Sequence, residues 1–353
     1  MRLRDYVLRR VLTNVLGAAA VLLAVLQILD LLEVTPDIIA RNLGFQGILH
    51  YASLRFPRLL QQAAPLGVLA GSIFAFMKLA ADSEIIAMRA SGVSAYRILG
   101  MALPAALMVM VVDFAAVELV APHTDPALLT WWRATAPPAP TAAPKPKAFR
   151  VGADLAVATT NDLTGHTLAN VRIYRRDAAG RLTERIVATS ATYGPQGWRL
   201  NAPKFTRFNG INVSTGEAAQ MSWAQDFRPA DVQALFFGDE AMSAASARRA
   251  LSGGGAERPP SYYATLLQRS IAAPVAALVM LLLTMPVALA SFRSGRAAVF
   301  VVGSLAAGLL YIVADGLLSA LGESGTVSPI LAAWTAPLLF AALGGAMLVK
   351  LEG

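Results

Sequence analysis

The chain has 353 residues, of which 56% are hydrophobic and only 15% are charged, and its mean hydropathy is +0.54. Soluble domains carry about a quarter charged residues, so this composition indicates a membrane protein. A net charge of +8 would suggest nucleic-acid binding in a soluble protein, but here the basic residues collect beside apolar segments, as in membrane proteins. We therefore expect no nucleic-acid partner. The absence of cysteine excludes disulfides, thiolate metal sites and cysteine nucleophiles.

Six apolar windows are long enough to cross a bilayer, since a spanning helix needs about 20 mostly apolar residues. They cover residues 11–32, 59–81, 98–121, 271–292, 297–321 and 328–349. The first window is too long for a signal peptide, and Asp30, Glu33 and Pro36 follow it instead of a small-residue cleavage site. We therefore expect it to remain as the first spanning helix.

Basic residues are concentrated on one side of these windows. That side carries Arg2, Arg4, Arg9, Arg10, Lys78, Arg89, Arg97, Arg293, Arg296 and Lys350, whereas the other side carries Arg41, Arg55 and Arg58. Because cytoplasmic loops carry the excess of lysine and arginine, both termini and the loop after the second window are predicted to be cytoplasmic. The large insert after the third window is then on the far side of the membrane.

A short polar segment, "ADSEIIAMRASGVSAYR" (81–97), joins the second window to the third. Asp82 or Ser83 can cap a helix, Glu84 falls in its first turn, and Gly92 is placed to end it. Such a short helix is marginal alone and must dock on something. Two alternatives follow: the helix lies on the bilayer surface, or it docks into a cytoplasmic motor as a coupling helix at about 82–92.

Residues 122–265 are predicted to hold an all-β domain together with its linkers. Runs such as "NVRIYRR" and "RIVATSATYG" alternate polar and apolar residues and are broken by turn residues, as in antiparallel strands. A proline-rich connector (137–147) precedes them, and a glycine-rich segment (251–261) is expected to be a flexible return linker. The domain either stands alone or pairs a strand edge with another protein. The predicted spans place one half of the membrane region at 1–121 and the other at 266–353.

No constellation of catalytic residues is visible. The three histidines, His50, His123 and His166, are scattered, and the chain contains no HExxH, GxSxG or phosphate-loop motif. Four acids lie within or near the spans and indicate either a proton relay or pairing near the interface: Asp30, Asp113, Glu118 and Asp315. Gly67 and Gly71 form a GxxxG motif, which permits close approach of helices.

Several stretches together resemble one known family. The segment "APLGVLAGSIFAFMKLAADSEIIAMRASGVSAYRIL" (64–99) is similar to the second helix and coupling helix of the LptF/LptG family of lipopolysaccharide-export permeases. "VELVAP" (117–122) resembles the end of that family's third helix, and residues 173–200 resemble its periplasmic β-jellyroll. The "WRL" strand is more like the LptG type. The resemblance covers nearly the whole chain.

The resemblance implies a fold and a function. The expected fold is an α-helical polytopic membrane protein of six transmembrane helices with an inserted all-β periplasmic domain of the β-jellyroll type. Two paralogous permeases pair in the bacterial inner membrane, and a dimeric cytoplasmic ATPase, which holds ATP and Mg²⁺, drives them. They extract lipopolysaccharide from the outer leaflet. They then pass it to a periplasmic β-jellyroll bridge protein, with a single-span membrane jellyroll protein also in the complex.

The family's functional positions map onto two groups of residues. Glu84 and Arg89 match the coupling helix, and we expect Ile85 and Met88 to fill a groove of the ATPase. Arg58 and Arg133, with Arg41 and Arg55, are expected to contact the phosphorylated sugar of the lipid. One departure is the acidic outer end of the first helix, with Asp30, Glu33 and Asp37 where members can carry lysines. Headgroup contacts must then come from elsewhere, or divalent cations must bridge.

Two other classes of function compete with the permease. A polytopic membrane enzyme would need a nucleophile–base pair or a metal site, and none is visible in the sequence. A membrane scaffold or transducer that transports nothing is harder to separate, because it could use the same coupling helix.

Overall fold

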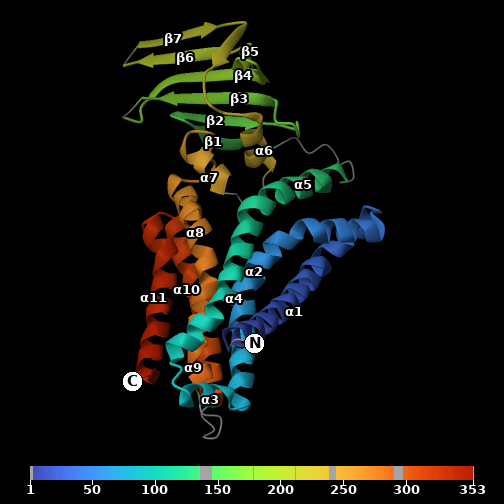
Figure 1. Cartoon of the computed structure of the whole chain (residues 1–353). Helices are drawn as coiled ribbons and strands as arrows, with labels where there is room; N and C mark the ends of the chain where they lie inside the picture. The colour runs from blue at the N-terminus through green and yellow to red at the C-terminus, as the bar shows by residue number, and fades with distance from the viewer. Residues whose placement is uncertain are drawn as a thin grey trace. The chain divides into compact units, whose positions relative to one another are not determined.

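The structure is a computed structural model that describes residues 3–135, 145–177, 179–210, 212–237, 244–289 and 297–352 (Figure 1). The chain divides into two compact units: residues 1–124 with 268–353, and residues 125–267. We call the first the membrane unit and the second the β unit, and each is described by itself. The predicted connector at 137–147 falls largely outside the described residues, as do Arg2, Arg293 and Arg296.

The membrane unit contains six helical segments long and apolar enough to span a bilayer. The predicted layout of six apolar helices, with a β domain inserted between the third and the fourth, is confirmed. The helices of this unit are α1 (Leu3–Ala40), α2 (Gly44–Ala81), α3 (Glu84–Ala90), α4 (Ala95–Ala115), α8 (Pro260–Leu283), α9 (Met285–Leu289), α10 (Ala297–Glu323) and α11 (Pro329–Glu352).

The first two helices are longer than the apolar windows that predicted them. Each has 38 residues, or about 57 Å at 1.5 Å per residue, against a hydrocarbon core of about 30 Å. The turns outside the windows carry charged residues, such as Asp5 in the first turn of α1 and Arg55 and Arg58 in the first half of α2. A hydropathy window detects only the part of a helix that crosses the hydrocarbon core, because only that part must be apolar.

The third span does not end where the sequence suggested. After α4 the helix continues through a π-turn, η1 (Ala116–Val120), into α5 (Ala121–Ala134). Pro126 lies inside α5, where it has no backbone N–H to donate to the preceding turn. Residues 122–134, at the start of the range predicted for the β domain and its linkers, are therefore helical.

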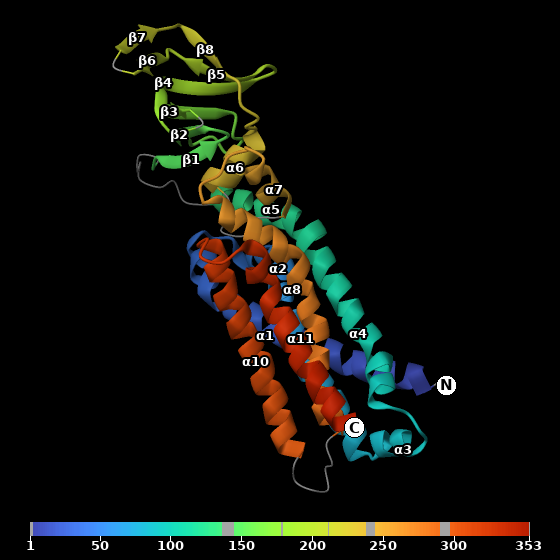
Figure 2. The ribbon, with the colours of Figure 1, turned by 90° about the vertical axis from the view of Figure 1, so that its left-hand side faces the viewer.

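Helices α1 and α2 pack at a glycine seam (Figure 1). A Cβ atom added at Gly71 would lie 2.3 Å from the Cα of Val15, and one added at Gly67 would lie 2.6 Å from the Cβ of Ala19. The GxxxG motif thus brings α2 against the backbone of α1, as its spacing predicted. At the other side of the unit, α10 and α11 run side by side (Figure 2).

The β unit contains one antiparallel sheet of eight strands, with the order β1-β2-β3-β4-β5-β8 and with β6 and β7 attached beside β4. The long strand β4 pairs with β6 through its first half and with β5 through its second half. The strands are β1 (Lys147–Val151), β2 (Asp154–Thr159), β3 (Thr167–Arg176), β4 (Leu182–Gly194), β5 (Gly197–Asn201), β6 (Lys204–Asn209), β7 (Asn212–Glu217) and β8 (Gln220–Trp223).

One face of the sheet is apolar and is covered by the aromatic core of this unit. Ile173 lies opposite Ile186, which in turn lies opposite Phe205. Trp198 and Trp223, each 1% exposed, face each other across β5 and β8. The indole nitrogen of Trp198 donates to the carbonyl of Phe227 at 2.7 Å. These buried rings fix the register, because a slip by one residue would turn them to solvent.

A ladder of ion pairs joins β2, β3, β4 and β6 on the same face of the sheet, next to these apolar residues. Arg175 binds Asp154 at 3.5 Å and Glu184 at 2.7 Å, and Arg207 binds Glu184 at 2.7 Å. Asp154 and Glu184 are 1% and 6% exposed, so both carboxylates depend on these partners. The ladder is structural, because each buried acid is already paired with an arginine.

The glycine-rich return segment is not a free linker, which corrects the prediction for residues 251–261. Ala256 exchanges two backbone hydrogen bonds with Arg150 of β1, at 2.8 and 2.7 Å. The hydroxyl of Tyr263 accepts from the backbone N–H groups of Glu257 and Arg258. Two short helices that were not predicted from the sequence precede the return segment: α6 (Pro229–Phe237) and α7 (Ala244–Leu251).

The glycine seam generates a first prediction. Gly71→Ala should destabilise the membrane unit by about 1–3 kcal/mol, because the new methyl group meets backbone atoms of α1 that cannot rotate away. The thermal unfolding midpoint of the purified protein in detergent measures the effect. Gly100→Ala in α4 is the matched control, since no atom lies within 4 Å of its new Cβ. Equal midpoints for the two variants would contradict the close packing at the seam.

Candidate functional site

The loop between α2 and α4 contains a short, well-defined helix. Helix α3 has seven residues and ends in a Schellman motif: Gly92, at φ +82°, donates to the Arg89 carbonyl, and Val93 donates to the Met88 carbonyl. Gly92 therefore has the role that the sequence predicted. The predicted side-chain cap is wrong, because Ser83 adopts a left-handed conformation and neither it nor Asp82 caps the helix with its side chain.

Helix α3 is anchored to its own chain. Ile85 and Met88 are 3% and 6% exposed and belong to the same apolar cluster as Val7 and Val11 of α1. Both side chains are therefore packed within this chain, and the expectation that they fill a groove of a partner stays a prediction. The helix is stable despite its length because the membrane unit supplies the docking surface, so its shortness alone does not require a motor.

The opposite face of α3 is exposed. It carries Ile86, which is 56% exposed, together with Ala87, Arg89 and Ala90. Protein interfaces commonly have an apolar side chain at the centre and polar or charged residues around it. The exposed Ile86, with alanines and Arg89 beside it, has this composition. Figure 2 shows α3 at the same end of the membrane unit as the two labelled ends of the chain.

Glu84 occupies the first turn of α3 and is half-buried. Its Oε1 accepts a hydrogen bond of 2.8 Å from the hydroxyl of Tyr6 in α1. Within the described ranges no lysine, arginine or histidine forms an ion pair with Glu84. Its negative charge is therefore held in place without being neutralised.

Two further contacts fix the loop. Arg10 of α1 forms an ion pair of 3.5 Å with Asp82. At the other end of the loop, both carboxylate oxygens of Glu352 in α11 accept from the backbone N–H of Ala95, at 3.0 and 2.8 Å. Ala95 begins α4, so Glu352 satisfies one of the free donors at that helix start. The sequence analysis missed Tyr6, Arg10 and Glu352, because no local pattern reveals contacts with residues so distant in the chain.

The arginines predicted to bind lipid are all half-buried, and the structure assigns them to different surroundings. Arg55 forms an ion pair of 3.2 Å with Asp30 of α1, so its charge is offset. Arg41 and Arg58 also belong to the membrane unit, and Arg133 belongs to the β unit; all three are engaged in interactions. The ion pair also neutralises one of the three acids at the outer end of α1.

The acids within the spans separate into paired and unpaired groups. Asp315 of α10 binds Arg269 of α8 at 2.9 Å, as Asp30 binds Arg55, which supports pairing over a proton relay for both. Asp113 of α4 is 3% exposed, and its Oδ1 has no hydrogen-bond partner among the described residues. No group of three metal-ligating side chains is present in the described ranges.

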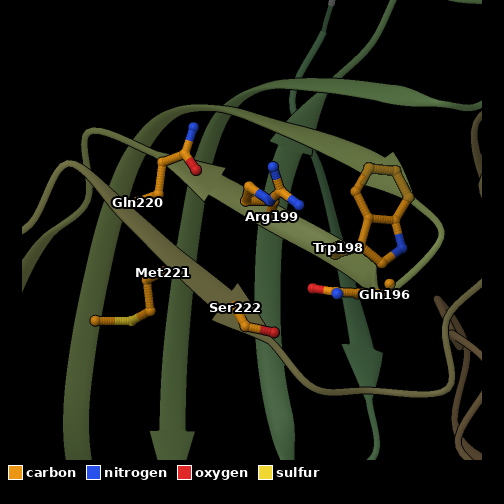
Figure 3. Close-up of a pocket in the computed structure, with 7 residues that line it drawn as sticks. Gln196, Trp198, Arg199, Gln220, Met221 and Ser222 are labelled. Atoms are coloured by element: carbon orange, nitrogen blue, oxygen red, sulfur yellow. The ribbon is translucent and has the colours of Figure 1, made fainter.

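A shallow, open hollow of the β unit lies beside the edge strand β8. Figure 3 shows Arg199, Gln220 and Ser222 around it, with Met221 and Gln196 at its sides. Arg199 lies opposite Ser222 on the polar face of the sheet. The lining contains a single charged side chain and no acid–base pair, so the geometry does not provide a catalytic site.

The free strand edges of the β unit lie outside the two runs that the sequence analysis quoted. "NVRIYRR" and "VATSATYG" form β3 and β4, which are hydrogen-bonded on both sides and have no free edge. Strand β7 pairs only with β6, and β8 pairs only with β5. Strand β1 also lies at an end of the sheet, but the return segment bonds to Arg150 and Gly152 there. The exposed strand β7 and the edge strand β8 are therefore the more open edges.

Comparison with known proteins identifies one family. The model of the lipopolysaccharide export system permease LptF/LptG matches residues 5–350. A search of the curated proteins finds no match. The matched range includes all six spans, the loop between α2 and α4, and the β unit, as the resemblance of the sequence implied.

Proposed function

Because the chain belongs to the LptF/LptG family of lipopolysaccharide export permeases, we propose that it is one of two paralogous permeases in an ATP-driven inner-membrane complex. Such permeases are transport subunits without catalytic activity. The complex extracts lipopolysaccharide from the outer leaflet and passes it to a periplasmic bridge of β-jellyroll domains. The observation that carries the proposal is the loop between α2 and α4 (residues 82–94), which we call the coupling loop. Its helix is held against α1 and presents the exposed Ile86 and Glu84, an acid with no ion-pair partner among the described residues.

In this proposal the coupling loop and both termini are cytoplasmic, and the β unit is periplasmic. Arg4, Arg9 and Arg10 lie at the start of α1, on the same side as Lys350 at the end of α11. On the other side the charge of Arg55 is offset by Asp30, which strengthens the asymmetry.

The ATPase then binds the exposed face of α3. Ile86 enters the partner as the apolar anchor, Arg89 forms part of the rim, and Glu84 binds a basic residue of the ATPase. Ile85 and Met88 contribute by holding the helix against the spans. ATP and Mg²⁺ are bound by the ATPase, in keeping with the absence of a phosphate-binding loop from this sequence.

The lipid headgroup is bound by arginines near the outer boundary. Arg41 and Arg58, with Arg133 of α5, supply the positive charge for phosphate, and Arg55 keeps the acidic end of α1 from repelling it. The β unit then continues the path by pairing β7 or β8 with a like domain of a bridge protein or of a single-span membrane protein. We further assign the chain to the LptG type, on the strand Trp198-Arg199-Leu200. Mass spectrometry of the purified complex should then identify an LptF-type partner.

The runner-up function is a scaffold or transducer that uses the same loop but carries no lipid. The two functions differ in what co-purifies with the chain. A permease brings both the ATPase and lipopolysaccharide, whereas a scaffold brings the ATPase alone.

A cysteine placed at Ala179 tests the orientation. Ala179 lies in the turn between β3 and β4, which Asp177 closes by accepting from the backbone N–H groups of Ala179 and Arg181. The new thiol should react with a membrane-impermeant reagent in intact spheroplasts. A cysteine at the exposed Ala87 of α3 is the matched control and should react only after lysis. The reverse pattern would overturn the orientation.

Replacing both Arg58 and Arg133 by Ala tests the lipid site. Lipopolysaccharide co-purified per mole of protein should fall severalfold, because two charge-assisted contacts to phosphate are lost. Assembly with the ATPase should be unchanged. Arg9→Ala, at the opposite end of α1, is the control and should keep the lipid content. An unchanged lipid content in the double variant would exclude these two arginines.

Glu84→Ala tests the coupling role. A cation of the ATPase would be left unpaired in a partly desolvated interface, which costs about 2–5 kcal/mol. Association with the ATPase should therefore weaken and export should cease, while the permease still inserts and folds. Glu84→Lys should be worse, and an acid introduced on the ATPase should restore part of the function. Full association and full export with Glu84→Ala would favour the reading in which α3 lies on the membrane surface.

A further inference from the structure

The first turns of α1 are joined to the coupling loop by one continuous face. Tyr6 donates to Glu84, and Arg10 binds Asp82 one turn later. Val7 and Val11, both 0% exposed, lie beside them and share a core cluster with the buried residues of α3. These four positions have helical spacing, so a single stripe of α1 makes both the polar and the apolar contacts.

The hydrogen bond from Tyr6 has a specific consequence for Glu84. A carboxylate on a flexible side chain has several orientations, and binding a partner requires one of them to be selected. Tyr6 occupies Oε1, at 2.8 Å, and leaves Oε2 without a hydrogen bond among the described residues. The tyrosine donates and carries no charge, so it orients the carboxylate without reducing its attraction for a cation.

We infer that Tyr6 is a positioning residue for ATPase coupling: its hydroxyl holds the Glu84 carboxylate in the orientation in which a basic residue of the ATPase binds it. This inference rests on the proposed function, since it assumes that Glu84 meets the ATPase. It adds that α1, and not only the loop, takes part in the docking site. A force applied to Glu84 is then passed directly to the first turn of α1.

A purely structural role for Tyr6 predicts different behaviour. If the hydroxyl only stabilised the loop, its removal would lower stability, and its effect on the ATPase would not depend on Glu84. If it acts through Glu84, its removal matters only while Glu84 is present. A double-mutant cycle separates these cases, because it measures the dependence of one residue's effect on the other.

The experiment uses the assembled permease complex in lipid nanodiscs, titrated with the purified ATPase. The permease carries the natural sequence, Tyr6→Phe, Glu84→Ala or both changes. Tyr6→Phe keeps the ring, so the packing of α1 is retained. We expect Tyr6→Phe to weaken association about fivefold, the factor that an ordinary net hydrogen bond corresponds to. In the Glu84→Ala background we expect Tyr6→Phe to have no further effect.

The outcomes distinguish the two proposals. If Glu84→Ala leaves association unchanged, the coupling role of Glu84 fails, and the inference fails with it. If Glu84→Ala weakens association while Tyr6→Phe has no effect or the same effect in both backgrounds, only the inference is overturned. A lower unfolding midpoint for Tyr6→Phe with unchanged association would also overturn it. Tyr96→Phe is the control: Tyr96 is 49% exposed with no hydroxyl hydrogen bond in the described ranges, and it should show no dependence on Glu84.

Discussion

The contact between α1 and α2 at Gly67 and Gly71 is the constraint on which the membrane unit depends. Backbone-to-backbone approach at this seam fixes the position of α1, a helix whose buried residues are otherwise few. From that position the start of α1 brings Tyr6 to Glu84, and the far part brings Asp30 to Arg55 of α2. One packing contact in the middle of the helix therefore determines the electrostatics at both of its ends. The loop between α2 and α4 and the Asp30–Arg55 ion pair are thus positioned by a single helix.

Burial and pairing explain how this chain tolerates charge among its spans. Asp30 and Asp315 each face an arginine from a neighbouring helix, so the cost of a carboxylate in lipid is offset by a local partner. In the β unit, Asp154 and Glu184 follow the same rule within the arginine ladder. Two acids depart from this rule: Asp113 is buried with one carboxylate oxygen that has no partner among the described residues, and Glu84 is half-buried and accepts from a neutral donor. Of the two, Glu84 lies at the loop where we propose that a partner binds.

The sequence predicted what depends on periodicity and local turn chemistry. The six spans, the antiparallel strands and the end of α3 at Gly92 follow from hydropathy, alternation and the conformational freedom of glycine, and all are present. It failed where a residue's environment is supplied by distant parts of the chain. The burial of Ile85 and Met88 against α1, for example, depends on residues that no local pattern connects to α3. The pairing of β4 with β5 and β6 placed the open edges at β7 and β8, a result of topology that alternation does not encode.

The cap that Glu352 provides to α4 has a practical consequence for handling this protein. The side chain lies in the last turn of α11, outside every segment that the sequence singled out, yet its two oxygens hold the N–H of Ala95 at the start of α4. A shortened version that removes the final residues of α11 would lose this contact and loosen the loop that precedes α4. Affinity tags or fluorescent reporters fused after Glu352 would lie beside the same loop. The turn at residues 177–181, at the end of a hairpin in the other unit, is the safer place for a label.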